Sequence, residues 1–205
     1  MPVADFPARD PAGWARATRH PFLTAVRDGT LPEAAFNAWL VQDYRFVTGL
    51  LRFQARLLAR APRTTQPVLA NGAVALVDEL AWFERHADER RLDLSAPPLP
   101  ATVVYAELLE RLDGTDVAVA LAMLWAMERA YLDAWSHAAP GAPAYRDFVD
   151  HWTTPQFGRY VANLATAADG AMQRAGGRSD VGRWFAEIIH AESNFWGMAC
   201  TGDWR

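Results

Sequence analysis

Residues 30–61 carry a long helical pattern, and this pattern sets the class of fold. On a helix that advances about 100° per residue, six large apolar side chains share one stripe. They are Phe36, Trp39, Leu40, Phe46, Val47 and Leu50. Asp43 lies in the middle of that stripe, where a core residue is expected. An unpaired, ionised carboxylate in an apolar interior costs roughly several kcal/mol. We therefore expect Asp43 to have a partner inside the fold or to face a cavity.

Helical periodicity continues along the rest of the chain. It predicts helices over residues 11–28 (broken near His20 and Pro21), 66–90, 101–112, 116–137, 145–152, 156–174 and 180–199. Gly29 is expected to cap the helix before it, and the spacing of Thr30 and Glu33 predicts a capping box at the start of the next helix. No alternating strand pattern and no internal repeat occurs in the sequence. We expect a single all-α domain over residues 1–205, folded as a helical bundle.

Two further carboxylates repeat the arrangement around Asp43. Glu128 is centred on an apolar face made by Leu121, Leu124, Trp125, Tyr131, Leu132 and Trp135. Glu192 is centred on one made by Phe185, Ile188, Ile189, Phe195, Trp196 and Ala199. A single inward carboxylate is commonly a structural group that hydrogen-bonds a neighbouring helix. Three of them would repel one another if ionised in a dry core, so a shared polar cavity or a shared cation is the more economical interpretation.

The chain also contains nine tryptophans, and four of them lie near these acids in the sequence: Trp39, Trp125, Trp135 and Trp196. They could wall a site for a flat, partly polar ligand, or they could simply pack the bundle. Both interpretations stay open at the level of sequence.

The charge and the residue inventory exclude several functional classes. The formal net charge is −4 and there is no basic stripe, so a nucleic-acid partner is not expected. No apolar run approaches the ~18 residues of a membrane span, and the first residues lack the pattern of a signal peptide, so we expect no membrane partner and a cytoplasmic location. All 20 basic residues are arginine, which removes lysine Schiff bases and the P-loop lysine. Cys200 is the single cysteine, so an internal disulfide is impossible, and we expect a partly buried structural role for it.

Two parts of the sequence resemble a known family. The segment HPFLTAVRDGTLPEAAFNAWLVQDYRF combines HPF, GTLP and QDY, and ESNFWGMA follows near the end of the chain. In this order the motifs are similar to those of the thiaminase II (TenA) family, and the likeness runs from about Phe6 to Ala199. The resemblance implies one heme-oxygenase-like helical domain that assembles as a homo-oligomer, either a dimer or a tetramer. It also implies cleavage between an aminopyrimidine and its leaving group, in thiamin or in aminomethylpyrimidine breakdown products, which releases hydroxymethylpyrimidine for thiamin salvage.

The resemblance also assigns roles to individual residues. Asp43 matches the family aspartate that hydrogen-bonds the aminopyrimidine, and Glu192 matches the glutamate that manages protons. Tyr105 and Tyr131 match tyrosines that line the substrate pocket.

Three positions depart from the family pattern, and we expect all three at the substrate pocket. Met127 stands where the usual nucleophilic cysteine is found, four residues before Tyr131, and methionine cannot replace a thiolate. Phe46 and Trp152 occupy two other tyrosine positions. The chain therefore resembles the cysteine-less branch of the family, which implies a catalytic glutamate in this region. Glu128 is the residue expected in that role.

The resulting hypothesis is a hydrolysis that needs no cofactor, at the exocyclic methylene carbon of the pyrimidine or at an adjacent amide bond. Asp43 would bind the amino-pyrimidine edge, Glu128 would activate a water molecule or attack directly, and Glu192 would carry a proton to the leaving nitrogen. Burial is expected to raise the pKa of at least one glutamate above its usual ~4.3. Cleavage of thiamin itself stays an open question.

Two other functional classes also stay open. A di-metal oxygenase on the same scaffold would use Glu79 and His86, which share a helix face, together with Glu128. A non-catalytic pyrimidine-binding or regulatory protein would keep the pocket without the chemistry.

Overall fold

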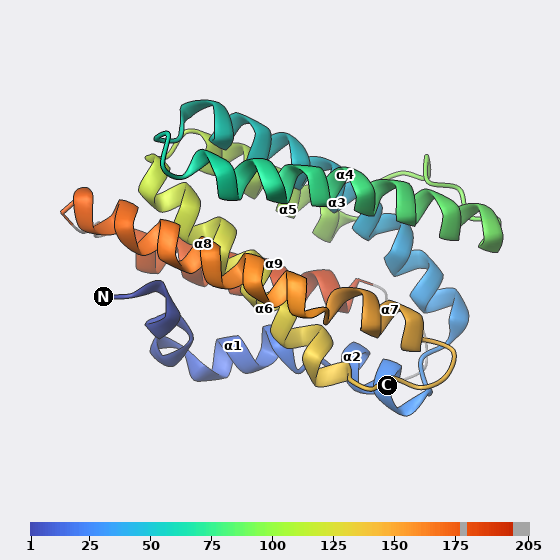
Figure 1. The fold of residues 1–205 in the computed structure, drawn as a ribbon. Coiled ribbons are helices and arrows are strands. Elements are labelled where there is room, and N and C mark those ends of the chain that lie inside the picture. The colour runs from blue at the N-terminus through green and yellow to red at the C-terminus, as the bar shows by residue number, and fades with distance from the viewer. Residues whose placement is uncertain (177–179, 199–205) are drawn as a thin grey trace.

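The computed structural model describes residues 1–176 and 180–198, and these residues are helical throughout, with no strand among them. The elements in chain order (Figure 1) are η1 (Val3–Arg9), α1 (Pro11–Thr18), α2 (Pro21–Asp28), α3 (Glu33–Arg60), α4 (Gln66–Arg90), α5 (Pro100–Asp113), α6 (Val117–Ala138), α7 (Arg146–Trp152), α8 (Pro155–Arg174) and α9 (Val181–Gly197). The predicted all-α bundle is confirmed. Ala199 and Cys200, the predicted end of the last helix and the single cysteine, lie outside the described residues.

The helices form three layers around α6 (Figure 1). Helix α6 packs against α8 and α9 in the middle layer, while α3 pairs with α4 and α5 above it and α1 and α2 lie below. Every residue of α6 from Ala118 to Ala130 is buried except Arg129, because this part of the helix is apolar on every face. A carboxylate on this central helix, such as Glu128, therefore has no route to bulk solvent except through a cavity.

Local sequence signals account for most of the helix ends. Gly29 adopts φ 74° at the end of α2, a left-handed conformation that glycine tolerates without strain. The side chains of Asp10 and Thr154 accept hydrogen bonds from the backbone N–H groups of Gly13 and Phe157 at the starts of α1 and α8. Each of these helices, like α2, α4 and α5, has a proline in its first turn, where the missing N–H costs nothing.

The predicted capping box at Thr30 and Glu33 is wrong. Helix α3 begins at Glu33 with Pro32 as its N-cap, and no side chain caps it. The backbone N–H of Thr30 instead donates to the carbonyl of Ala25, 2.9 Å away, so Thr30 belongs to the end of α2. The short helix η1 is not predicted by the sequence pattern, yet it buries Val3 and Phe6 in the core.

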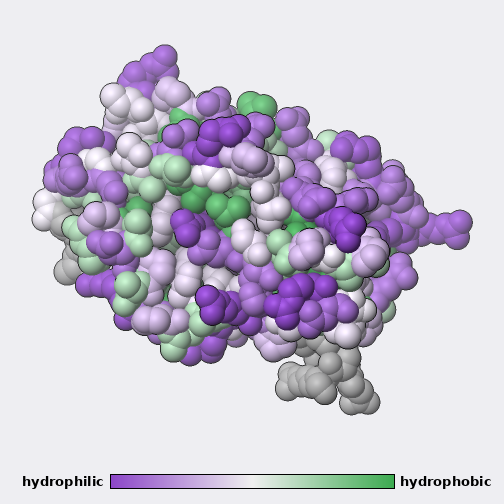
Figure 2. All heavy atoms as spheres, turned by 60° about the horizontal axis from the view of Figure 1, so that its bottom comes forward, coloured by the Kyte–Doolittle hydropathy of each residue, from purple (hydrophilic) through white to green (hydrophobic). Residues whose placement is uncertain are grey.

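The surface is mixed in character. Figure 2 shows one face of the molecule, on which small hydrophobic areas are surrounded by hydrophilic residues. Scattered apolar side chains of this kind are normal for a folded domain. Within the described part of the chain, none of the helices is both long and apolar enough to cross a membrane.

Candidate active site

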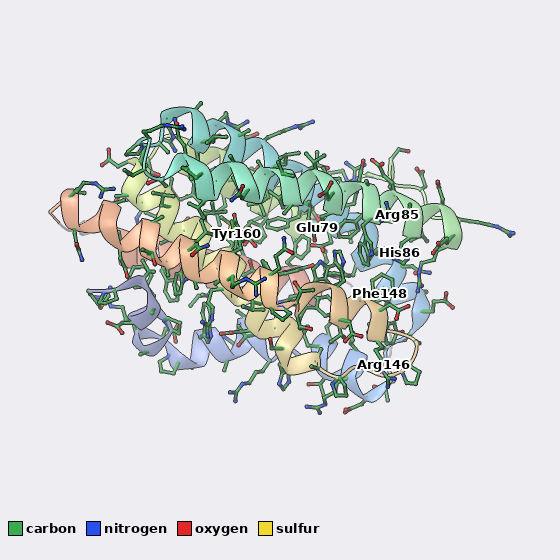
Figure 3. All side chains as sticks on the ribbon, viewed as in Figure 1. Glu79, Arg85, His86, Arg146, Phe148 and Tyr160 are labelled. Carbon is green, nitrogen blue, oxygen red and sulfur yellow. The ribbon has the colours of Figure 1, made fainter. Side chains whose placement is uncertain are left out.

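A cavity of about 760 Å³ lies between α4, α6 and α8 and is completed by residues of α3, α7 and α9. The lining side chains with chemical or aromatic character include Phe46 on α3, Glu79 and Trp82 on α4, Met127, Glu128 and Tyr131 on α6, His151 and Trp152 on α7, Tyr160 on α8, and Glu192 on α9. Figure 3 shows Glu79 and Tyr160 in the space between α4 and α8. The volume falls within the ~300–1,000 Å³ typical of small-molecule sites.

Three glutamates from three different helices face this cavity. Burial raises the pKa of Glu128 to about 8, and the nearby Glu79 and Glu192 add to the rise. Burial likewise raises the pKa of Glu79 to about 7 and that of Glu192 to about 7. Raised pKa values of this size near neutrality are what general acids and bases need.

Two of the three glutamates are held by a hydrogen-bond donor. The Tyr105 hydroxyl donates to Glu192 Oε1, and Trp152 Nε1–H donates to Glu79 Oε1 over 2.7 Å. Each donor favours the ionised carboxylate and partly opposes the effect of burial on its pKa. No donor from the described residues contacts the Glu128 carboxyl, so its oxygens are available to a molecule in the cavity.

Asp43 lies one layer behind the cavity wall and is fully buried. Its Oδ2 accepts a hydrogen bond of 2.7 Å from the Tyr131 hydroxyl, which confirms the expectation of a partner inside the fold. Its Oδ1 has no hydrogen-bond partner among the described residues. Burial raises the pKa of Asp43 well above its ordinary value, although the Tyr131 hydroxyl opposes the rise. Asp43 thus acts on the cavity through Tyr131, which lines it.

The other predicted pocket residues divide between the wall and the layer behind it. Phe46, Met127, Tyr131 and Trp152 line the cavity. Tyr105 is 1 % exposed and stands behind Phe46, its ring centroid 4.5 Å from that of Phe46. Tyr105 therefore contacts the site only through its hydrogen bond to the Glu192 carboxyl.

The tryptophans form part of the wall and much of its support. Trp82 and Trp152 line the cavity, with ring centroids 5.2 Å apart. Trp39, Trp135 and Trp196 are fully buried and pack around Trp152 and Tyr131. Trp125 lies elsewhere, against Phe6. The four tryptophans near the acids in the sequence therefore pack the bundle, and two others, Trp82 and Trp152, line the cavity.

The sequence pattern did not predict that Glu79 lines the cavity beside Glu128 and Glu192, and Glu79 was considered only as a possible metal ligand. Its position between Leu76 and Phe83 on the inward face of α4 was the available signal. Of the two partners proposed for a metal, Glu128 shares the cavity with Glu79, whereas His86 pairs with Glu89. His86 Nδ1 lies 3.3 Å from Glu89 Oε2, and its ring packs edge-on against Trp82. Across residues 1–176 and 180–198, no group of three or more His, Cys, Asp and Glu is placed to hold a metal ion.

The structure defines a class of protein, the all-helical domain that encloses a cavity of the size and aromatic lining common in small-molecule sites. Comparison with known proteins makes the class specific. Residues 11–202 match the TENA/THI-4/PQQC family, and the chain belongs to that family.

Individual relatives agree with this assignment. The chain is 32% identical over 200 residues to the "Probable bifunctional TENA-E protein" of Glycine max, a match that covers 89% of this chain and 86% of the relative. A TenA homologue from Pyrococcus furiosus superposes with a TM-score of 0.89 at 27% identity, over 97% of this chain and all of that one. A TenA family transcription regulator from a Silicibacter species gives the same TM-score at 19% identity, over 97% and 96% of the two chains, which shows a shared fold.

Proposed function

We propose that this protein is a thiamin-salvage hydrolase that acts on an aminopyrimidine, either aminomethylpyrimidine or its N-formyl derivative, and releases hydroxymethylpyrimidine. The observation that carries the proposal is the cluster of Glu79, Glu128 and Glu192 around one aromatic cavity, with Met127 in place of a thiolate. Membership of the TENA/THI-4/PQQC family supports a role in thiamin salvage. The soybean relative that carries the name TENA-E supports the same branch.

The proposed reaction on aminomethylpyrimidine replaces its C–N bond with a C–O bond. Water attacks the exocyclic methylene carbon as nitrogen leaves, so the protonated amine and water give hydroxymethylpyrimidine and ammonium. Glu128, whose carboxyl has no protein donor in the described chain, takes the proton of the attacking water. Nitrogen leaves as ammonia, and Glu192, held by Tyr105, carries a proton to it so that ammonium is released. On the N-formyl derivative the same residues would act first at the amide bond, which releases formate.

The aromatic wall and the Asp43–Tyr131 pair have the binding role in this proposal. Phe46 and Trp152 flank the pyrimidine ring, and Met127 fills the space that a cysteine would occupy. The Tyr131 hydroxyl, fixed by Asp43, meets the amino-pyrimidine edge, and Asp43 acts on that edge through Tyr131. Orientation of the ring by these groups would place the methylene carbon toward Glu128.

A product assay tests the proposal. Chelator-treated, metal-free protein is offered aminomethylpyrimidine, its N-formyl derivative and thiamin in parallel, and hydroxymethylpyrimidine is measured. We expect release from the first two compounds, loss of release in Glu128→Gln, and wild-type rates in Glu110→Gln, an exposed glutamate on α5. If no compound is turned over but hydroxymethylpyrimidine binds in calorimetry, a non-catalytic pyrimidine-binding protein replaces the hydrolase. Turnover that returns only with added iron or manganese would instead move the assignment to a metal-dependent oxygenase.

A further inference from the structure

Glu79 stands apart from the other acids of the cavity because it comes from the upper layer of the bundle. Glu128 and Glu192 belong to α6 and α9, whereas Glu79 projects from α4 into the space between α4 and α8 (Figure 3). The indole N–H of Trp152, on α7, holds its Oε1 at 2.7 Å. One oxygen of Glu79 is therefore fixed by the protein, and the carboxyl is presented to the cavity in a set orientation.

The surroundings of Glu79 favour positive charge. Glu128 and Glu192 share the cavity with it, and Asp43 lies just behind. His151 also lines the cavity, but burial lowers its pKa to about 4, so it is neutral at pH 7. The arginines that line the cavity, Arg85 and Arg159, are both exposed and belong to its solvent side. Because the chain has no lysine, the described interior of the cavity contains carboxyls and no counter-charge.

Aromatic rings beside Glu79 add to the same preference. Trp82 lies one turn further along α4, and its ring stacks on that of His151 at a centroid distance of 4.0 Å. Trp82 and Trp152 meet at an interplanar angle of 73° and form a corner next to Glu79. Faces of tryptophan rings attract cations, and a carboxylate accepts short, strong hydrogen bonds from an ammonium group.

We propose that Glu79, oriented by Trp152, forms an ammonium subsite in the cavity and determines specificity for a cationic free amine over a neutral N-acylated amine. This inference rests on the proposed function and deepens it. The free aminomethyl group carries a proton at neutral pH, while the N-formyl group cannot, so the two proposed substrates differ in the charge that Glu79 would meet. Binding as the ammonium form also leaves the nitrogen ready to depart as neutral ammonia.

The test compares the two substrates in wild-type protein and in Glu79→Gln. We expect Glu79→Gln to lower kcat/KM for aminomethylpyrimidine by about tenfold to a hundredfold, the effect of losing one hydrogen bond to a charged group. For the N-formyl derivative we expect a change of less than about threefold, because no charged bond is lost. Glu110→Gln is the matched surface control. Trp152→Phe, which removes the indole donor, is expected to lower kcat/KM for aminomethylpyrimidine relative to kcat/KM for the N-formyl derivative. An equal loss for both substrates would show a structural role for Glu79, and no loss for either would overturn the subsite.

A binding measurement separates this inference from the proposed function. Calorimetry compares cationic aminomethylpyrimidine with neutral hydroxymethylpyrimidine, and it needs no turnover. We expect wild-type protein to bind the cation at least about tenfold more tightly and Glu79→Gln to bind the two compounds alike. If neither substrate is hydrolysed but this preference is present, the hydrolase proposal fails and the subsite stands. If both are hydrolysed and wild-type protein shows no preference, the subsite fails alone.

Discussion

Glu128 is held in the bundle at a cost that depends on pH. Its pKa of about 8 in the folded protein exceeds its ordinary value of 4.5, so the folded state binds the proton more tightly than the unfolded state does. Between about pH 4.5 and pH 8 the folded protein carries more protons on this group, and stability therefore falls as pH rises through that window.

Glu128→Gln should remove this cost, because glutamine resembles the protonated acid and cannot ionise. We expect the variant and the wild type to have similar melting temperatures at pH 5, and the variant to be more stable at pH 8 by about 4 kcal/mol, or ~8–16 °C in Tm. Thermal unfolding of both proteins at the two pH values measures the difference. A gap of the same size at pH 5 and pH 8 would show that ionisation of Glu128 is not its cause.

Tyr105 controls the ionisation of Glu192 through its hydroxyl. The pKa of Glu128 is about 8 and that of Glu192 is about 7. We therefore expect a bell-shaped dependence of kcat/KM on pH with a maximum between about pH 7 and pH 8. The two limbs of the curve report the titration of the two glutamates together. Tyr105→Phe removes a donor that lowers the pKa of Glu192, so its optimum should move to higher pH. The pH–rate profiles of the two proteins decide this, and Tyr145→Phe, whose hydroxyl donates to the Leu31 carbonyl, serves as a control with an unmoved optimum.

At the scale of elements, α4 packs tightly against α3 and α8 at Gly72. A Cβ there would lie 2.3 Å from Gln54 Nε2 and 2.3 Å from the Tyr160 hydroxyl, and 2.6 Å from the rigid ring carbon that carries it. Gln54 is fully buried and donates to the Leu69 carbonyl, so it has little room to move. The cost of overpacking, about 1–3 kcal/mol, should outweigh the gain in helix propensity.

Gly72→Ala is therefore expected to destabilise the protein by about 1–3 kcal/mol and to reduce activity, because Tyr160 lines the cavity. Gly158→Ala on α8 is the matched comparison, since no atom lies within 4 Å of its added Cβ, and it should stabilise by ~0.5–1 kcal/mol. Chemical denaturation of the two variants gives both values. Equal effects at the two sites would show that packing at Gly72 is not limiting.

The elements were largely predictable because each helix carries its own periodicity and end signals. Helix α4 has the predicted bounds, α6 differs from prediction by one residue at each end, and α8 differs by one residue at its start. The start of α3 was mispredicted because Thr30 can either cap α3 or end α2, and only the chain geometry decides between the two.

The candidate site was predictable only in part. The helical periodicity indicates that Asp43, Glu128 and Glu192 point into the bundle, but not how far each lies from the cavity. Which acid lines the cavity and which stands behind Tyr131 depends on the spacing of whole helices, and the role of Glu79 depends on its contact with Trp152 from a distant segment.

For the whole molecule, the family resemblance predicts a homo-oligomer, a dimer or a tetramer. Val74 and Val77 on α4 are 62 % and 53 % exposed, and Val103 and Val104 on α5 are also exposed. Burial of such side chains between copies would be favourable, by about 25 cal/mol per Å² of apolar surface. Light scattering coupled to size exclusion should therefore give a mass of two or four times 22.8 kDa. A mass of 22.8 kDa at micromolar concentration would contradict the prediction.

The cavity joins the upper and middle layers, so a ligand that fills it should stabilise the whole bundle rather than one helix. Its wall comes from α3 and α4 above and from α6, α8 and α9 in the middle, and unfolding of any of these helices would remove the binding site. Hydroxymethylpyrimidine, the proposed product, stabilises the folded state by about 2.7 kcal/mol when its concentration is 100 times Kd. For a chain of this size we expect a rise in Tm of about 5–10 °C. The analogue without the amino group should give a smaller rise, because it lacks the group that the proposal assigns to the hydrogen-bonded Asp43–Tyr131 pair. The two compounds are compared at equal concentration and the same pH, and each Kd is measured by calorimetry. Equal shifts in Tm would show that the Asp43–Tyr131 pair does not take part in recognition, while the cavity would remain the binding site.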